Sequence, residues 1–392
     1  MKVIRDPLHG HIEVDEIGLK LLDTRGIQRL RRIRQLGFSH LVYPGANHTR
    51  FEHSLGTYHL TDLLLKQLKI ENEELKAAAL LHDVCHGPYS HATEKVLFRY
   101  TKKTHEDVEK TISTGQIGDV LEEFSLSPKN VAGHVMGSSD LQVLHSEIDV
   151  DRMDYLVRDA YYTGVAFGLV DHLRLIHEMY ILNGDLVVKI EGIKAVESLL
   201  VSRFLMRPTV YYHHVSRIAE SMFARALELM IEDHKLELDA LKTMDDYELN
   251  MAMRRSGGYP GEIIGRINNR RLFKRAIYVG PESVNIESIK KDKKRMEKEI
   301  TEVSGLEDGY VILDLPEEPK IEEIKAKVLI DDEIKQLHEV SYVVKMLELA
   351  ERESWRVGVY TPEEHKDEVE KAARDILNVE RKPKQQFLVE FY

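Results

Sequence analysis

Apolar residues recur at helical spacing through the first two thirds of the chain. Between about Ile17 and Met253 they follow an i, i+3, i+4, i+7 pattern, and few Gly or Pro residues interrupt the periodic segments. Such stripes give each helix one apolar face and predict a core of packed helices. The segments are "LKLLDTRGIQRLRRIRQLG", "SLGTYHLTDLLLKQLKI", "NEELKAAALLHD", "LHSEIDVDRMDYLVRDAYY", "KAVESLLVSRFLM" and "VSRIAESMFARALELMIED".

The pattern changes after a Gly- and Pro-rich stretch, "RRSGGYPGE" (254–262), which predicts a turn. Beyond about Phe273, charged helical segments such as "EEHKDEVEKAARDIL" alternate with short runs typical of β-strands. These runs are "AIYVG", "YVILDLP", "KAKVLI" and "RVGVYTP". We therefore predict a mainly α protein with an all-helical domain over residues 1–272 and a smaller C-terminal α+β domain over residues 273–392.

Composition narrows the class of protein. The chain has 392 residues, of which 43% are hydrophobic and 31% charged, enough to bury a large core. No apolar run approaches the roughly 18 residues that a membrane span needs, and the start "MKVIRDPLHG" lacks a signal-peptide stretch. The single cysteine, Cys85, excludes an intramolecular disulfide. We expect a cytoplasmic protein with no membrane partner, and the net charge of -12 argues against nucleic acid as a partner.

Candidate chemistry lies in the helical part, because only three of the histidines follow His214. His53 lies in "RFEHS", His82 and Asp83 are adjacent in "LLHDVCHGPYSH", and Asp151 lies in "EIDVDRMDY". Imidazole and carboxylate together suit a divalent metal. Adjacent helical residues point about 100° apart, so His82 and Asp83 share one ion only if other helices complete the ligand set.

Each of these residues also has a simpler interpretation. A single His in a helical protein is more often a hydrogen-bonded core or surface residue than a ligand, and Asp151 alone fits the start of a surface helix. An adjacent His and Asp at the end of an apolar helix favours a metal, because charged groups are rarely buried without a partner. Spacing alone leaves both interpretations open.

Several motifs together resemble a known family. In chain order they are "DPLHGHIEV", "DTRGIQRLRRIRQLG", "VYPGANHTRFEHSLG", "HDVCHGPYSH" and "DVDRMDYLVRD". They resemble the HD-domain phosphohydrolases, specifically the deoxynucleoside triphosphate triphosphohydrolase branch. The resemblance is strong from about Lys2 to Gly168, fair to about Asp233 and weak beyond Phe273. It implies that His53, His82, Asp83 and Asp151 bind one divalent ion (Mn, Fe, Co, Ni, Zn or Mg), with additional Mg accompanying the nucleotide.

The same resemblance implies a set of substrate contacts. Arg50, Arg152 and Arg203 are expected to hold phosphate oxygens. Tyr211 is expected to pack on the nucleoside, while Asp159 and Tyr155 meet the 3′-hydroxyl and the 2′ position of deoxyribose. The remaining matched positions are Gln35 and Leu36 by the base and His91 by the phosphates. The chain departs from the family at Arg152, where Lys is common, at Glu94, where Asp is common, and at Arg207, where some members have His.

The expected catalytic residues are His86, His105 and Asp151. His86 follows His82 by one helical turn, and we expect Gly87-Pro88 to end that helix. The resemblance implies that protonated His105 donates to the leaving 5′-oxygen while water attacks the α-phosphorus, giving a deoxynucleoside and intact triphosphate. From the sequence alone, His105 fits better as a cap or an exposed residue of a surface helix.

An arginine-rich segment, "DTRGIQRLRRIRQLG", suggests a second nucleotide site. Four arginines within six residues of a helix usually form a solvated face or ion pairs in an acidic chain. The resemblance instead implies that a guanine nucleotide effector binds between subunits of a homo-tetramer or dimer. The matched positions are Lys2, Arg5, Asp23, Gln28 and Arg31.

Two other functions remain open. An HD-type nucleotidase or phosphodiesterase acting on other nucleotides would use the same metal site. A nucleotide sensor or single-stranded nucleic-acid binder would retain the site without turnover. We favour triphosphate hydrolysis because Arg50, Arg152 and Arg203 supply more positive charge than one phosphate requires.

Overall fold

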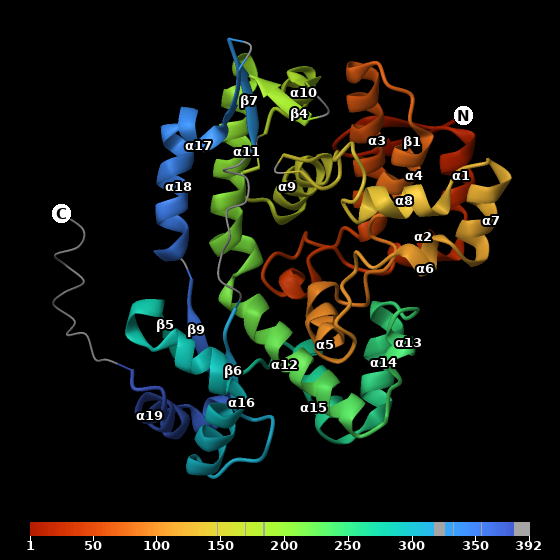
Figure 1. Cartoon of the computed structure of the whole chain (residues 1–392). Coiled ribbons are helices and arrows are strands. Elements are labelled where there is room, and N and C mark those ends of the chain that lie inside the picture. Colours follow the sequence, from red (N-terminus) through yellow and green to blue (C-terminus); the bar gives the residue numbers. More distant parts are fainter. Residues whose placement is uncertain are drawn as a thin grey trace.

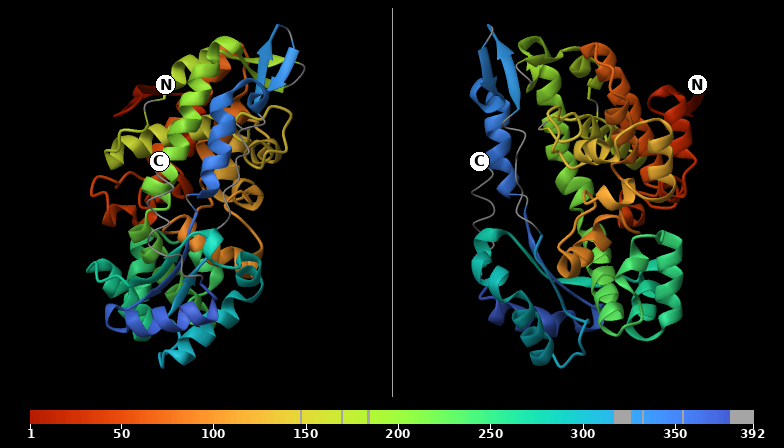
Figure 2. Two further views of the ribbon diagram at one scale, coloured as in Figure 1. Left: turned by 90° about the vertical axis from the view of Figure 1, so that its left-hand side faces the viewer. Right: turned by 45° about the vertical axis from the view of Figure 1, so that its right-hand side comes forward.

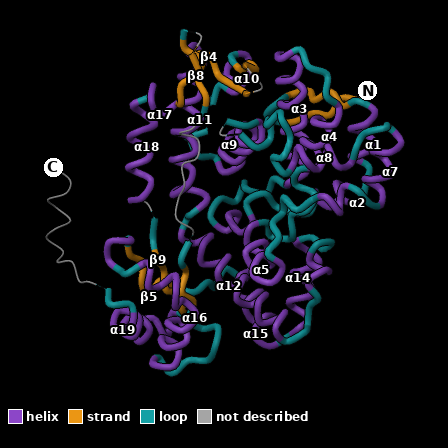
Figure 3. Tube along the Cα trace, in the orientation of Figure 1, coloured by secondary structure: helices purple, strands orange, loops and turns teal. Residues whose placement is uncertain are grey.

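A computed structural model describes residues 1–146, 148–168, 170–182, 185–316, 326–331, 333–353 and 355–379. Helices dominate it, which confirms the mainly α prediction, and the strands gather in three separate places (Figures 1 and 3). In chain order the helices are α1 (Glu16–Leu22), α2 (Arg25–Leu30), α3 (Arg50–Leu68), α4 (Glu73–Leu81), α5 (His91–Thr101), α6 (Glu109–Ile112), α7 (Gly115–Glu123), α8 (Pro128–Val135), α9 (Val150–Thr163), α10 (His172–His177), α11 (Ile193–Met206), α12 (His214–Glu232), α13 (Leu238–Leu241), α14 (Asp246–Ser256), α15 (Gly258–Asn268), α16 (Ile286–Val303), α17 (Leu337–Val340), α18 (Tyr342–Glu353) and α19 (Lys366–Ile376). None of the described helices is both long and apolar enough to cross a membrane.

The first core packs around α3, α4, α9 and α11. Local sequence signals start three of these helices. Thr49 and Glu52 form a capping box at α3, while Asn72 caps α4 and Asp149 caps α9 through their side chains. The last five residues of α4 are all buried. These helices therefore form a rigid support at the place where the candidate chemistry lies.

The end of α4 differs from the prediction that its helix continues to His86 and is ended by Gly87-Pro88. The helix ends at Leu81, and the following residues form tight turns in which Val84 N donates to Leu81 O and His86 N to Asp83 O, both at 3.0 Å. His82 itself keeps right-handed helical dihedral angles (φ -56°, ψ -35°), so the chain tightens into i→i−3 turns without reversing its direction at the candidate ligands.

Strands in the helical part were not predicted. The strands are β1 (Lys2–Asp6), β2 (Gly10–Val14), β3 (Met179–Leu182), β4 (Asp185–Lys189), β5 (Lys274–Val279), β6 (Ile312–Asp314), β7 (Lys327–Ile330), β8 (Glu333–Gln336) and β9 (Val357–Thr361). β1 and β2 form an antiparallel hairpin before α1. β3 and β4 join β7 and β8 in one sheet, in which Val188 of β4 pairs with Val328 of β7 in parallel.

The predicted C-terminal strands form, and they divide between two places. β5, β9 and β6 make an antiparallel sheet, with α16 and α19 packed on it. Successive side chains of each strand point to opposite faces of this sheet. Leu313 and Val359 pack in the core of α16 and α19. Ile312 and Tyr360 pack in the core around α12. β7 and β8 instead extend the sheet of β3 and β4, and α18 packs along α11 (Figure 2).

The division at residues 272 and 273 stays a prediction. The C-terminal stretch contributes to a sheet shared with β3 and β4 as well as to a sheet of its own. Lys325, the first residue of the predicted strand "KAKVLI", and residues 380–392 of the predicted second domain lie outside the described residues.

Candidate active site

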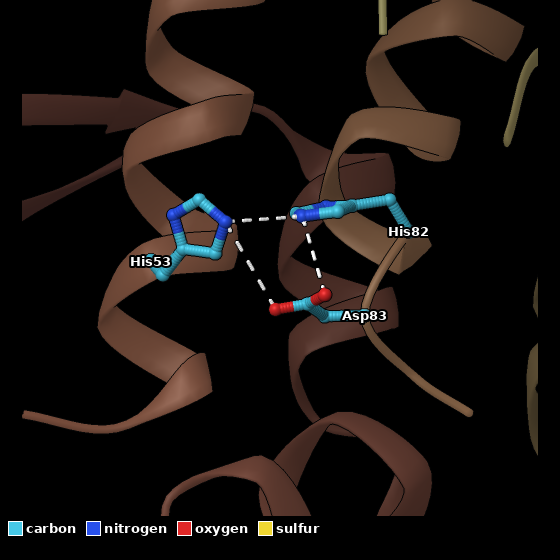
Figure 4. A group of neighbouring side chains, drawn as sticks. All are labelled: His53, His82 and Asp83. Carbon is cyan, nitrogen blue, oxygen red and sulfur yellow. Dashed lines mark hydrogen bonds and ion pairs between the residues drawn. The ribbon is translucent and has the colours of Figure 1, made fainter. Parts of the chain in front are cut away.

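Four predicted ligands come together where α3 and α9 meet the turn after α4. We call His53, His82, Asp83 and Asp151 the metal cluster. Nε2 of His53 lies 2.8 Å from Oδ1 of Asp151, 3.2 Å from Nε2 of His82 and 4.0 Å from Oδ2 of Asp83. Figure 4 shows three of these side chains converging from α3 and from the turn after α4.

The donor set fits a divalent cation. Donor atoms of His53, His82 and Asp83 all lie within 4.8 Å of one another, and Oδ1 of Asp151 lies 3.6 Å from Nε2 of His82. Ligands about 2.0 to 2.2 Å from one ion lie roughly 3 Å apart when they are neighbours around it. Two imidazoles and two carboxylates suit a borderline metal with positions left for water. The geometry does not select one metal.

The surroundings of the metal cluster fix its side chains. His53 Nδ1 lies 2.8 Å from Oδ2 of Asp154, and His82 Nδ1 lies 2.8 Å from the carbonyl of Ala79. Burial opposes protonation of His53, but the hydrogen bonds to Asp151 and Asp154 outweigh it and raise its pKa to about 10. Asp154 was not among the predicted residues, although it follows Asp151 by three positions on the same turn of α9.

Asp83 is held as an anion. Arg50, on the first turn of α3, donates from Nη1 to Oδ2 of Asp83 at 2.7 Å, and from Nε to the hydroxyl of Ser90 at 2.8 Å. Burial would raise the pKa of Asp83, but the Arg50 charge and the neighbouring imidazoles lower it to about 2. Nη2 of Arg50 is buried with no hydrogen-bond partner among the described residues. A cationic donor thus remains available beside the metal cluster.

A second group of imidazoles lies next to the first. We call His86, His91, Glu94 and His105 the outer histidine cluster. The rings of His86 and His105 stack with centroids 3.9 Å apart, and Nε2 of His86 lies 3.3 Å from Oδ1 of Asp83. Glu94 accepts hydrogen bonds from Nδ1 of His105 and from Nδ1 of His91. The predicted catalytic His86 and His105 therefore lie together at the edge of the metal cluster.

Burial and nearby positive charge keep His86 neutral. Its ring is 1% exposed, and burial followed by the charge of Arg50 moves its pKa well below the usual value. Its Nδ1 atom is buried without a hydrogen-bond partner among the described residues. Glu94 is the opposite case, because hydrogen bonds from His105 and His91 outweigh its burial and lower its pKa.

The predicted phosphate contacts take different positions. Arg152 binds the side chain of Asp149 and the carbonyl of Ser146, at the start of its own helix. Arg203 lies on α11, and its positive charge opposes the rise that burial causes in the pKa of Tyr155 and of Asp149. Their role in holding phosphate stays a prediction.

The predicted sugar contacts form a connected group. Tyr211, at the end of a π-helical turn (Arg207–Tyr211), donates to Oδ2 of Asp159 at 2.8 Å, and the ring of Tyr155 lies between Tyr211 and His53, with centroids 6.3 Å from each. His48 was not predicted, yet its Nε2 lies 2.7 Å from Oδ1 of Asp159 and its ring stacks on Tyr162. The sequence could have indicated His48, because it lies in "GANHTRFEH" close to Arg50 and His53.

The predicted base contacts lie beside this group. Gln35 donates from its backbone N to the carbonyl of His48 at 3.1 Å, and its Oε1 is buried without a hydrogen-bond partner among the described residues. Leu36 is partly buried against the first core. Both roles stay predictions.

The predicted second nucleotide site is only partly assembled within one chain. Lys2 and Arg5 lie exposed on β1, and Asp23 is exposed at the end of α1. Gln28 accepts from Nε of Arg31 at 3.0 Å, and Arg31 also lies over the ring of Phe51. The expectation that four arginines share one helix is wrong, because α2 ends at Leu30 and the buried Arg29 donates to the carbonyls of Val84, His86 and Met244.

Comparison with known proteins identifies the class. The family model described as HD domain matches residues 50–159, which contain the whole metal cluster, and the model described as HD associated region matches residues 170–388. The chain therefore belongs to the HD-domain phosphohydrolase family that carries this associated region. The associated region extends past Phe273, where the resemblance in the motifs is weak, and includes the C-terminal sheet.

Relatives and solved structures agree with this class. An uncharacterized protein of Methanocaldococcus jannaschii is 35% identical over 395 residues, covering 96% of this chain and 83% of that protein. The deoxynucleoside triphosphate triphosphohydrolase SAMHD1 of Gallus gallus is 27% identical over 353 residues, covering 73% of this chain and 57% of that protein. A phosphohydrolase structure from Bacteroides thetaiotaomicron matches with a TM-score of 0.76 at 25% identity, covering 92% of this chain and 100% of that one.

Proposed function

We propose that the chain is a metal-dependent deoxynucleoside triphosphate triphosphohydrolase, which releases a deoxynucleoside and intact triphosphate. The observation that carries this proposal is Arg50, whose guanidinium is buried beside Asp83 with Nη2 unpaired among the described residues. A buried cationic donor without an acceptor is costly unless an anion completes it. The similarity to the protein named deoxynucleoside triphosphate triphosphohydrolase supports the substrate class.

The outer histidine cluster provides the proton for the leaving group. Glu94 holds Nδ1 of His105, so Nε2 of His105 is left to face the substrate. Water attacks the α-phosphorus, the bond from phosphorus to the 5′-oxygen breaks, and His105 protonates that oxygen. The attacking water releases a proton to solvent, and His105 takes one up from solvent to complete the cycle. A divalent ion held by the metal cluster would act as a Lewis acid and would stabilise the charge developing on phosphoryl oxygens.

The group around Asp159 is placed to orient the sugar. Its carboxylate is fixed by His48 on one oxygen and by Tyr211 on the other, and each oxygen retains a lone pair for a further donor. We assign that remaining capacity to the 3′-hydroxyl, with Tyr155 limiting space beside the 2′ carbon.

Product analysis tests this function. The purified chain is incubated with Mn²⁺ or Mg²⁺ and each of the four dNTPs, and the products are separated by ion-exchange chromatography. Inorganic triphosphate and deoxynucleoside in equal amounts support the proposal. Orthophosphate, or hydrolysis of cyclic nucleotides only, would replace it with an HD-type nucleotidase or phosphodiesterase.

We also propose that a guanine nucleotide binds at Lys2, Arg5, Asp23, Gln28 and Arg31 where subunits of a homo-oligomer meet. The exposure of Lys2, Arg5 and Asp23 leaves them available to a second subunit. Melting temperature and sedimentation are measured with and without dGTP or GTP, for the wild type and for Asp23→Ala. A shift in the wild type alone supports the proposal, and no shift in the wild type contradicts it.

A further inference from the structure

A buried carboxylate outside the metal cluster controls the orientation of one of its ligands. Asp154 lies on α9 with its side chain 0% exposed, and its Oδ2 atom lies 2.8 Å from Nδ1 of His53. We propose that Asp154 is the positioning residue that turns Nε2 of His53 into the metal cluster, and that His9 and Arg158 hold Asp154 in place. This inference rests on the metal-binding part of the proposed function and is independent of the substrate.

Four hydrogen bonds fix the Asp154 carboxylate. Arg158 donates from Nε to Oδ2 at 2.8 Å and from Nη2 to Oδ1 at 2.9 Å, a two-point contact that sets the plane of the carboxylate. Nε2 of His9 lies 2.6 Å from Oδ1, and His53 completes the set on Oδ2. Neither oxygen can turn without breaking contacts made from three different parts of the chain.

The hydrogen bond decides which nitrogen of His53 faces a metal. A neutral imidazole carries one proton, and the carboxylate of Asp154 can only accept. Nδ1 of His53 must therefore be the donor, and Nε2, which faces Asp151 and His82, presents its lone pair to a cation. Carboxylates commonly fix metal-binding histidines in this way.

Close packing between two helices supports the arrangement. A Cβ atom on Gly56, one turn after His53 on α3, would lie 1.9 Å from Oδ1 of Asp154 and 2.6 Å from Nη2 of Arg158. Only glycine leaves room for the ion pair at this crossing of α3 and α9. The motif "EHSLG" therefore contains both the ligand and the space that its orienting carboxylate requires.

The turn between β1 and β2 extends the network to the start of the chain. Asp6 accepts from Nη1 of Arg158 at 2.8 Å, and its other oxygen accepts from the backbone N of Leu8 and of His9. The His9 ring lies against His59 and His172, with centroids 5.3 and 5.6 Å away. Residues 6–9 are consequently part of the support for the metal cluster, although they bind no metal.

Metal affinity of the nucleotide-free protein tests the proposal. Chelator-treated wild type and Asp154→Asn are titrated with Mn²⁺, and free Mn²⁺ is followed by electron paramagnetic resonance. We expect the Kd of Asp154→Asn to rise about 10- to 100-fold, the usual effect of losing such a partner. The visible spectrum of the Co²⁺-loaded variant should also change, because the His53 ring can rotate.

His9 gives a second pair of variants that preserve the ion pair of Asp154 and Arg158. His9→Phe keeps the ring packing but removes the donor, and we expect an increase in Kd of about 3- to 10-fold, the weight of one hydrogen bond. His9→Gln restores a donor and should recover most of the affinity. If Asp154→Asn fails to fold, this pair alone decides the proposal.

Asp314→Asn is the matched control. Asp314 is also buried and bound at two points by an arginine, Arg217, with a further hydrogen bond from Tyr360, but it lies at the C-terminal sheet. The Asp314→Asn substitution should lower the melting temperature and leave the Kd for Mn²⁺ unchanged. Wild-type Kd values in Asp154→Asn and His9→Phe, or equal changes in the control, would overturn the proposal. Because no nucleotide is present, a wrong substrate assignment cannot produce either result.

Discussion

The metal cluster and the outer histidine cluster are both built from imidazoles and carboxylates, but these groups lie in different surroundings. In the metal cluster, carboxylates contact both nitrogens of His53, whose side chain is 1% exposed. In the outer histidine cluster, Glu94 contacts one nitrogen each of His91 and His105, whose side chains are 62% and 26% exposed. An imidazole held at both nitrogens can keep a fixed orientation, whereas one held at a single nitrogen can still exchange a proton at the other.

The two clusters also differ in their balance of carboxylates and imidazoles. The metal cluster contains two carboxylates and gains Asp154 behind His53, so it favours a cation. The outer histidine cluster has one carboxylate for three imidazoles, and it lies beside Arg50. The first is suited to holding a metal and the second to meeting an anion.

The largest effect should follow loss of the metal cluster. His82→Ala combined with Asp83→Ala removes two donors, and we expect turnover to fall by about 1,000-fold or more, because a metal contributes several kcal/mol to the transition state. Bound metal, measured by mass spectrometry, should fall with it. His177→Ala, which changes an exposed histidine on α10, is the control. Retained hydrolysis in the double variant would refute the metal assignment.

Changing the outer histidine cluster should lower turnover without releasing metal. His105→Gln removes the proton donor, and we expect kcat to fall by about 100-fold or more while the Kd for Mn²⁺ stays unchanged. His91→Gln should mainly raise KM, since His91 is expected to meet the phosphates. A wild-type kcat in His105→Gln would show that the leaving group takes its proton elsewhere.

Metal binding should strengthen as the pH rises. In the metal-free protein the pKa of His53 is raised to about 10, so near neutral pH a cation must displace a proton from Nε2. The association constant for Mn²⁺ should increase about tenfold per pH unit between pH 6 and 8 for each proton displaced. Calorimetry in buffers of different ionisation enthalpy measures the number of protons displaced by each Mn²⁺ ion that binds. Binding that is independent of pH would contradict it.

The raised pKa of His53 also predicts how the stability of the metal-free protein changes with pH. The folded pKa of His53 exceeds its ordinary value of 6.5, so its contribution to stability is complete below pH 6.5 and is lost as the pH rises toward 10. The melting temperature of the metal-free wild type should therefore fall over that range more than that of His53→Gln.

The smallest effect is expected at the sugar group. Tyr211→Phe removes the hydroxyl that donates to Asp159, and we expect KM for dNTPs to rise about 3- to 10-fold, with kcat little changed. Tyr310→Phe, which loses a hydrogen bond to Glu262 at the surface, is a matched control. A fall in kcat with unchanged KM would place Tyr211 in the chemical step instead.

Sequence reasoning identified what lies in local motifs. Helical periodicity predicted the mainly α fold, and the motifs around His53, His82 and Asp151 selected residues that the structure brings together. It missed partners supplied from far along the chain. His9 meets Asp154 across 145 residues and His48 meets Asp159 across 111, and no periodic pattern encodes such contacts.

Two predictions of secondary structure were wrong. The helix expected to run to His86 gives way to i→i−3 turns after Leu81, although the breaker pair Gly87-Pro88 comes only later in the sequence. β3 and β4 were missed because each is short and because their sheet is completed by β7 and β8, which lie far along the chain.

The parallel pairing of β4 with β7 has a consequence for synthesis on the ribosome. Val188 meets Val328, so the nascent chain emerges with β4 as a bare edge until 140 more residues have followed. Unpaired edges of this kind promote association with other chains, and closing such a long loop is slow. A chain terminated early, for example after α15, should therefore aggregate although its metal cluster is complete, and productive folding would benefit from a chaperone that shields this edge.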